Sequence, residues 1–301
     1  MTRRRAPRAV VVVAALLWGA VIAIGIDVLR VGGIETWLVA RGLADPGTGG
    51  VAPYQARGRL VDLSGRSIYL DCRGAGSPTV ILEAGLGGGA DGWGTFFDGI
   101  AAMTRTCAWD RAGIGRSPAR GLHTGFETAD DLVTTLSNAG ERGPFVVVAH
   151  SMGGLYARLF AAREPDVRAL VMLDTYDPDL GMADDPALPV DVRGAIRESI
   201  DGTGAVMEQV EQLDWAATLQ ELPPVTELPG FILADDPHNN FVNDDPAIPA
   251  AMIASWRRAI AAHYPNLRLE IVAGSGHFVH QDQPALVLAR IAAVLAEVKR
   301  G

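Results

Sequence analysis

A run near the middle of the chain, residues 146–155, constrains the fold more than any other segment. It reads Val-Val-Val-Ala-His-Ser-Met-Gly-Gly-Leu, so an apolar stretch typical of a buried strand ends at Ser151 and small residues follow. Ala149 and Gly153 stand two positions before and after the serine. Small residues there let a chain turn sharply from a strand into a helix, which lifts the serine Oγ clear of the sheet. The run therefore predicts a strand–turn–helix unit with Ser151 as a candidate nucleophile.

Four other segments accompany this run in a fixed order. Residues 79–88 are an apolar stretch that opens into a glycine-rich loop, residues 109–117 read Trp-Asp-Arg-Ala-Gly-Ile-Gly-Arg-Ser, residues 170–174 end in Asp174, and residues 274–280 contain Gly-His-Phe. Together with the run around Ser151 they resemble the α/β-hydrolase superfamily. The closest resemblance is to serine hydrolases with a DRxGxGxS loop before the nucleophile and a GHF loop that carries a histidine. It covers roughly residues 55–298.

The resemblance implies an α/β fold with a mostly parallel eight-stranded sheet in the order 1-2-4-3-5-6-7-8 and helices on both faces. Residues 55–175 and 229–301 would form the hydrolase core, and residues 176–228 a small helical cap inserted into it. Besides the strand before Ser151, strands are expected at 57–63, 66–72, 80–83, 105–109, 167–173, 230–234 and 268–272. Helices are expected at 126–138, 152–163 and 284–300, and cap helices around 192–200 and 206–219. Met182, Met207, Leu213 and Trp215 of the cap could line an acyl pocket.

A serine hydroxyl is too weakly acidic to attack an ester unaided, so a histidine must take its proton and later pass it to the leaving alcohol. His277 is the candidate, because the small residues 274–276 just after the last expected strand let a loop bring its ring over Ser151. His280 is the alternative. The other histidines, which are interpreted as surface or packing residues, are His123, His150, His238 and His263.

The carboxylate that orients the histidine has several candidates. Asp174 ends the sixth expected strand, and some members of the family carry their acid there. Others carry it after the seventh strand, where this chain has Asp235 and Asp236. Asp244 and Asp245 fit the expected spacing to His277 better, but they follow no strand directly. Asp174 is the first choice and Asp235 or Asp236 the alternative. Asp174 could also merely end a strand.

The negative oxygen of a tetrahedral intermediate needs hydrogen-bond donors that are already in place. The resemblance assigns the backbone N–H groups of Met152 and Leu86 to this oxyanion hole, with Gly87 as the alternative to Leu86. Ala84 and Gly85 replace the family's frequent His-Gly pair. Because a backbone donor needs no particular side chain, this change leaves the predicted oxyanion hole in place.

The N-terminus is the second informative region. Arg3, Arg4, Arg5 and Arg8 precede eighteen uncharged and almost wholly apolar residues, 9–26. This length spans a bilayer, and the arginines predict that their side stays cytoplasmic. The sequence therefore predicts a basic cytoplasmic tail at 1–8, a single transmembrane helix at 9–31, a linker at 32–54 and an extracytoplasmic catalytic domain. A cleaved signal peptide is the alternative, although its apolar region is usually shorter.

The net charge excludes one class of binding partner, and the two cysteines bear on the compartment of the protein. The net charge of −9, despite the N-terminal arginine cluster, argues against a nucleic-acid partner. The two cysteines, Cys72 and Cys107, fall on the second and fourth strands, which the family's strand order makes neighbours. They are either a disulfide, consistent with an oxidising compartment, or two separate buried thiols.

The sequence thus predicts a membrane-anchored serine hydrolase of carboxylesterase or lipase type, acting on small-molecule acyl esters, with no cofactor and no metal. A haloperoxidase or perhydrolase reaction could use the same three residues. A sensor or adaptor that keeps the fold without turnover is the alternative outside enzymology. Protein partners are not indicated.

Overall fold

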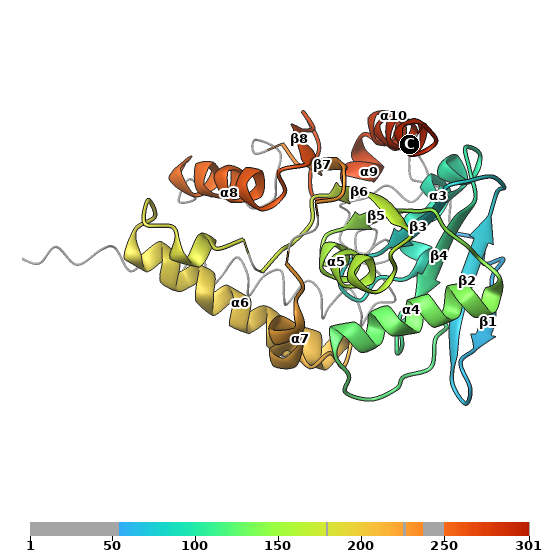
Figure 1. Cartoon of the computed structure of the whole chain (residues 1–301). Helices are drawn as coiled ribbons and strands as arrows, with labels where there is room; N and C mark the ends of the chain where they lie inside the picture. Colours follow the sequence, from blue (N-terminus) through green and yellow to red (C-terminus); the bar gives the residue numbers. More distant parts are fainter. Residues whose placement is uncertain (1–53, 179, 225–226, 237–249, 301) are drawn as a thin grey trace, which may run out of the picture.

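The computed structural model describes residues 54–300 except residues 179, 225–226 and 237–249 (Figure 1). The predicted basic tail, membrane anchor and linker therefore lie outside the described residues, apart from Tyr54. Asp244, Asp245 and His238 lie outside them as well. Within the described part of the chain, no helix is long and apolar enough to cross a membrane.

A single eight-stranded sheet forms the centre of the molecule, with strand order β1-β2-β4-β3-β5-β6-β7-β8. Strands β1 and β2 form the antiparallel edge, and β2 pairs antiparallel with β4; all pairs from β4 across to β8 are parallel. This confirms the predicted order. The strands are β1 Arg59–Asp62, β2 Ser67–Arg73, β3 Thr79–Glu83, β4 Thr106–Asp110, β5 Phe145–His150, β6 Val167–Leu173, β7 Gly230–Ala234 and β8 Leu267–Ile271.

Helices cover both faces of this sheet, as a parallel sheet requires. On one face α4 (Gly125–Ala139), α5 (Gly153–Arg163) and α8 (Ala250–His263) pack against the strands. On the other face lie α3 (Gly94–Ala101) and α10 (Pro284–Val298). Successive side chains of a strand point to opposite faces. Ile81 therefore enters the core under α4, α5 and α8, whereas Val80 and Leu82 enter the core under α3 and α10. Outside the cap, four elements were not predicted: η1 (Ala90–Trp93), α3, α8 and α9 (Val279–Asp282). The predicted ends of the other helices and strands outside the cap lie within about two residues of the observed ones. In the cap, the helix predicted around 192–200 extends to Val210 in the structure.

The cap between β6 and β7 contains the short helix η2 (Met182–Asp184), α6 (Val190–Val210) and α7 (Trp215–Glu221). The predicted single helix at 206–219 is wrong, because a turn with Gln212 at φ 54° separates α6 from α7. The periodicity continues across the turn since Met207, Leu213 and Trp215 enter one core with α5. These three side chains are at most 6 % exposed, so they are packing residues rather than pocket lining. The side chain of Met182 is not among those described.

Cys72 and Cys107 face each other on the antiparallel pair β2–β4, with Cα atoms 4.0 Å apart, and form a disulfide. Of the two alternatives, a disulfide or two separate buried thiols, the structure contains the disulfide. The bond joins the antiparallel edge of the sheet to its parallel part.

Candidate active site

Ser151 occupies the sharp turn between β5 and α5. Its backbone lies in the left-handed region, at φ 53°, and is held from three sides. The Ser151 N–H donates to the Leu173 carbonyl (3.1 Å), and the Ser151 carbonyl accepts from the N–H groups of Gly154 (3.1 Å) and Tyr176 (3.0 Å). A Cβ on Gly153 would lie far inside van der Waals contact with the Glu83 carbonyl oxygen. The small residue two positions after the serine is thus required by the close approach of β3.

His277 and Asp174 meet at the carboxyl ends of the parallel strands, where Ser151 also lies. The His277 Nδ1 lies 2.6 Å from the Asp174 Oδ2, and both side chains are mostly buried. Asp174 directly follows β6 at φ 42°, and its N–H donates to the Leu233 carbonyl (2.8 Å) of β7. Because Nδ1–H donates to a carboxylate, Nε2 is the nitrogen left to act as a base.

The alternative acids lie beside this pair but make different contacts. Asp235 is 6 % exposed, and its N–H is 3.4 Å from the Asp174 Oδ1. Burial and the charge of Asp174 raise the pKa of Asp235 to about 7. The Asp236 carboxylate accepts from the Gly274 N–H (2.8 Å) and so braces the loop that carries His277. Asp174 is therefore the sequence candidate that forms a hydrogen bond with the His277 imidazole.

Two further histidines line the back of the site. The ring of His150, the residue before Ser151, lies 4.7 Å from the ring of His277, and its Nε2–H donates to the His277 carbonyl (3.0 Å). His280 packs among His150, Trp93 and Phe96. Burial, with the nearby His277 as a smaller cause, lowers the pKa of His150 well below its ordinary value and that of His280 to about 3. Both rings are therefore neutral neighbours of His277, in line with a packing role.

The loop at residues 84–88, called the oxyanion loop for the role that the sequence predicts for it, lies against Ser151. A Cβ on Gly85 would be 3.1 Å from the Ser151 Cβ. Among the residues that the structure describes, neither the Leu86 nor the Met152 backbone N–H donates a hydrogen bond. The Gly87 N–H instead donates to the Glu211 carboxylate at 2.7 Å. Gly87, the alternative donor from the sequence, is therefore already engaged.

Three buried charged residues lie under this loop, Glu83, Arg111 and Glu211, and the sequence predicted a role for none of them. Arg111 belongs to the DRxGxGxS segment, and it forms ion pairs with Glu83 (2.8 Å) and Glu211 (2.8 Å). Burial raises the pKa of Glu83 to about 7, although the Arg111 charge opposes this shift. The motif could have drawn attention to Arg111. Glu211 had no such signal, because it lies 100 positions from Arg111 in the chain.

The described residues offer little to a metal ion. The group with donor atoms close enough is Cys72, Cys107 and Glu141, and there the two sulfurs are bonded to each other. That group lies at the β2–β4 pair and not at Ser151.

Comparison with known proteins bears on this arrangement. A model of the alpha/beta hydrolase family matches residues 80–290. The chain belongs to the α/β-hydrolase family. It is 37 % identical over 113 residues to lipase LipV of Mycobacterium tuberculosis (strain ATCC 25618 / H37Rv), which is 37 % of each protein. The chain spans less than half the length of the curated relatives it matches.

Solved structures share the hydrolase fold at low sequence identity. A thermophilic esterase from Thermogutta terrifontis, with malate bound, superposes with a TM-score of 0.53 at 21 % identity, over 81 % of this chain and 99 % of that one. Est816, described as an N-acyl homoserine lactone degrading enzyme, gives a TM-score of 0.55 at 17 % identity, over 78 % and 99 %. At such identities the likeness concerns the fold alone.

Proposed function

We propose that the protein is a serine hydrolase that cleaves carboxylic esters through an acyl-enzyme. The observation that carries the proposal is the 2.6 Å contact between Asp174 and His277 beside the strained turn of Ser151. The name of the relative LipV supports ester chemistry. Haloperoxidase or perhydrolase reactions, or a sensor role, have no specific observation in their favour.

In the proposed reaction the Ser151 Oγ attacks the ester carbonyl while His277 Nε2 takes the hydroxyl proton. The carbonyl π electrons move to the oxygen, and the backbone N–H groups of Met152 and Leu86 stabilise the resulting negative charge. When the tetrahedral species collapses, the carbon–oxygen bond to the alcohol breaks and His277 gives the alcohol its proton. Water then repeats the sequence on the acyl-enzyme and releases the acid.

Asp174 has an electrostatic role in this scheme. It holds His277 with Nδ1 protonated, and it stabilises the imidazolium that forms while Nε2 carries the serine proton. The neutral state of His150 and His280 matters here, because a charged neighbour would disfavour that imidazolium.

The test is hydrolysis of p-nitrophenyl esters of increasing chain length, together with labelling by a fluorophosphonate. Ser151→Ala and His277→Ala are expected to lose roughly 10³-fold or more in kcat, and Asp174→Asn a comparable factor. Asp235→Asn is the matched control, since it removes the neighbouring carboxyl without touching the contact to His277. If Asp235→Asn fails and Asp174→Asn is active, the acid assignment is wrong. If the wild type neither hydrolyses these esters nor is labelled by the fluorophosphonate, the proposed function is wrong.

A further inference from the structure

A buried polar cluster lies directly beneath the oxyanion loop, and its centre is Arg111, at 2 % exposure. All five guanidinium N–H groups have acceptors. Two donate to the Glu211 carboxylate (3.0 and 2.8 Å) and one to Glu83 (2.8 Å). The remaining two donate to the carbonyls of Ala84 (2.9 Å) and Gly85 (2.7 Å). A guanidinium saturated in this way is fixed in position and orientation.

Glu211 contributes the second half of the cluster from the cap. It directly follows α6, is 3 % exposed, and accepts from Arg111, from the Gly87 N–H (2.7 Å) and from the Tyr156 hydroxyl (2.6 Å). Although burial acts to raise it, the charge and hydrogen bonds of Arg111 hold the pKa of Glu211 below its ordinary value. The cap therefore supplies an ionised acceptor to two groups that shape the oxyanion loop.

The geometry of the peptide bond connects this cluster to Leu86. The Gly85 carbonyl and the Leu86 N–H belong to the same peptide group, which is planar and points the two in opposite directions. When Arg111 holds the Gly85 oxygen, it therefore also sets the direction of the Leu86 N–H. The next peptide group is held through the Gly87 N–H on Glu211. Gly88 N–H closes the turn on the Gly85 carbonyl (3.0 Å), with Gly87 at φ 65°, where glycine is favoured.

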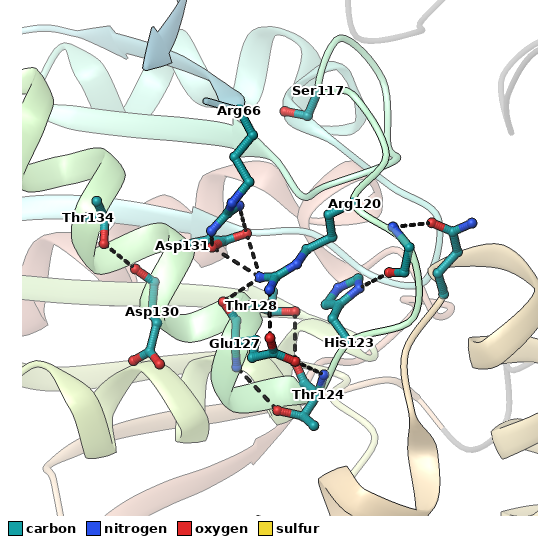
Figure 2. Close-up of polar contacts among 12 residues, drawn as sticks. Arg66, Ser117, Arg120, His123, Thr124, Glu127, Thr128, Asp130, Asp131 and Thr134 are labelled. Atoms are coloured by element: carbon teal, nitrogen blue, oxygen red, sulfur yellow. Dashed lines mark hydrogen bonds and ion pairs between the residues drawn. The ribbon is translucent and has the colours of Figure 1, made fainter. Parts of the chain in front are cut away.

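The cap turn that carries Glu211 is itself fixed to the loop that begins at Arg111. The His123 N–H donates to the Gln212 carbonyl (2.9 Å), and the Asp214 N–H donates to the His123 carbonyl (2.6 Å). His123 directly precedes Thr124, which caps α4 and forms a capping box with Glu127. Figure 2 shows this corner, where Arg120 also reaches Glu127. One loop thus carries Arg111 at its start and holds the turn of Glu211 at its end.

We infer that Glu211, acting through Arg111, is a positioning residue of the oxyanion hole. Its carboxylate holds the Gly85–Gly87 turn so that the Leu86 N–H is aimed at the developing oxyanion beside Ser151. The inference rests on the proposed ester hydrolysis and on Leu86 as a donor. It makes the cap part of transition-state stabilisation.

The test compares Glu211→Gln with wild type in ester hydrolysis and in binding of an aryl trifluoromethyl ketone, which adds to the serine as an oxyanion. Removing an oxyanion donor costs about 10²- to 10³-fold, so a misaimed donor is expected to lower kcat by roughly 10- to 100-fold with KM nearly unchanged. Affinity for the trifluoromethyl ketone should fall by the same factor. Affinity for the matching methyl carbinol, which carries no oxyanion, should be unchanged.

Two further variants separate positioning from general damage. Glu211→Asp keeps the buried charge but shortens the reach by one methylene, and it is expected to show the same losses to a smaller extent even if Glu211→Gln does not fold. Asp71→Asn is the matched control, because Asp71 is another fully buried carboxylate paired with an arginine, Arg73, at the β2 edge. It should lose stability without a loss in kcat.

The outcomes are distinct. Parallel losses in kcat and ketone affinity for both Glu211 variants support the inference. Folded Glu211 variants with unchanged kcat and ketone affinity overturn it, and fluorophosphonate labelling of Ser151 in the wild type then shows that the proposed function stands. Equal losses in Asp71→Asn also overturn it. A wild type that neither hydrolyses esters nor reacts with the fluorophosphonate overturns the proposed function, and the inference with it.

Discussion

At the scale of single residues, the site depends on two backbones in the left-handed region. Ser151 and Asp174 have φ values of 53° and 42°, and each directly follows a parallel strand. A non-glycine residue in this conformation costs on the order of 1–2 kcal/mol, which the surrounding hydrogen bonds must offset. The strain is possible because β5 and β6 lie in the middle of the sheet, where the N–H groups of both residues reach neighbouring strands.

Gly153→Ala is expected to destabilise the protein by about 2–4 kcal/mol and to abolish labelling of Ser151, because the new methyl group would overlap the Glu83 carbonyl. Chemical unfolding and fluorophosphonate labelling measure the two effects. Gly194→Ala in α6 is the control. A Cβ there meets no atom within 4 Å, so the substitution should stabilise the helix by roughly 0.5–1 kcal/mol. Equal effects from the two substitutions would contradict the packing argument.

Asp235 gives a pH-dependent prediction. Its pKa of about 7 in the folded protein lies well above the ordinary value of 3.8, so between these pH values the folded state binds more protons than the unfolded state. The stability that Asp235 contributes is full below about pH 4 and is lost as the pH rises towards 7. The free energy of unfolding of Asp235→Asn, relative to wild type, should therefore rise by about 2–4 kcal/mol from pH 4 to pH 7. A difference that stays constant or falls would refute the assignment.

At the scale of elements, the sequence predicts what local patterns encode. The strands β3, β5, β6 and β7 are predominantly apolar and buried, and α4 begins with a Thr124–Glu127 capping box and is followed by Gly140 in the left-handed region. The turn after α6 could not be predicted, since apolar positions keep a helical spacing through it. At this turn the Gln212 carbonyl accepts a hydrogen bond from the His123 N–H, a tertiary contact that the local sequence does not encode.

The disulfide between β2 and β4 is the element-scale feature with a measurable energy. It closes a loop with a sequence separation of 35, and loop-closure entropy for that length is worth about 3–4 kcal/mol. Cys72→Ser with Cys107→Ser is expected to lower the free energy of unfolding by this amount and to leave kcat unchanged, because the bond lies away from Ser151. Urea unfolding and ester hydrolysis test both statements. A loss of kcat in the folded variant would show that this edge of the sheet reaches the site.

At the scale of the whole molecule, the apolar segment at residues 9–26 sets the expected location. We propose that it anchors the chain in the membrane. The full-length chain is expected in the membrane fraction after alkaline extraction, while residues 51–301 should stay in the supernatant with ester hydrolysis intact. Recovery of the full-length chain in the supernatant at its full molecular mass would contradict the anchor. Recovery at a reduced mass would indicate a cleaved signal peptide.

The fold and the candidate site were predictable to different extents. Ser151 and His277 stand in local patterns, so each could be proposed as a site residue without coordinates. The acid could not, since Asp174, Asp235 and Asp236 are chemically equivalent in sequence and lie at the ends of adjacent strands. The choice depends on which carboxylate meets Nδ1 of His277. Glu211 could not be predicted either, because its partners Gly87, Arg111 and Tyr156 come from three segments distant in the chain.

The cluster of Arg111 and Glu211 also bears on how such a chain can be recombined. A boundary drawn at residues 176–228 suggests an exchangeable module, and grafting a relative's cap onto this core would be the obvious route to a new substrate range. Such a chimera would remove Glu211 and leave a buried guanidinium without half of its ion pairs. Caps that carry their own acidic residue at this position should be accepted by the core, and the others should require a compensating change at Arg111. The cap and the segment that carries Arg111 should therefore be exchanged together.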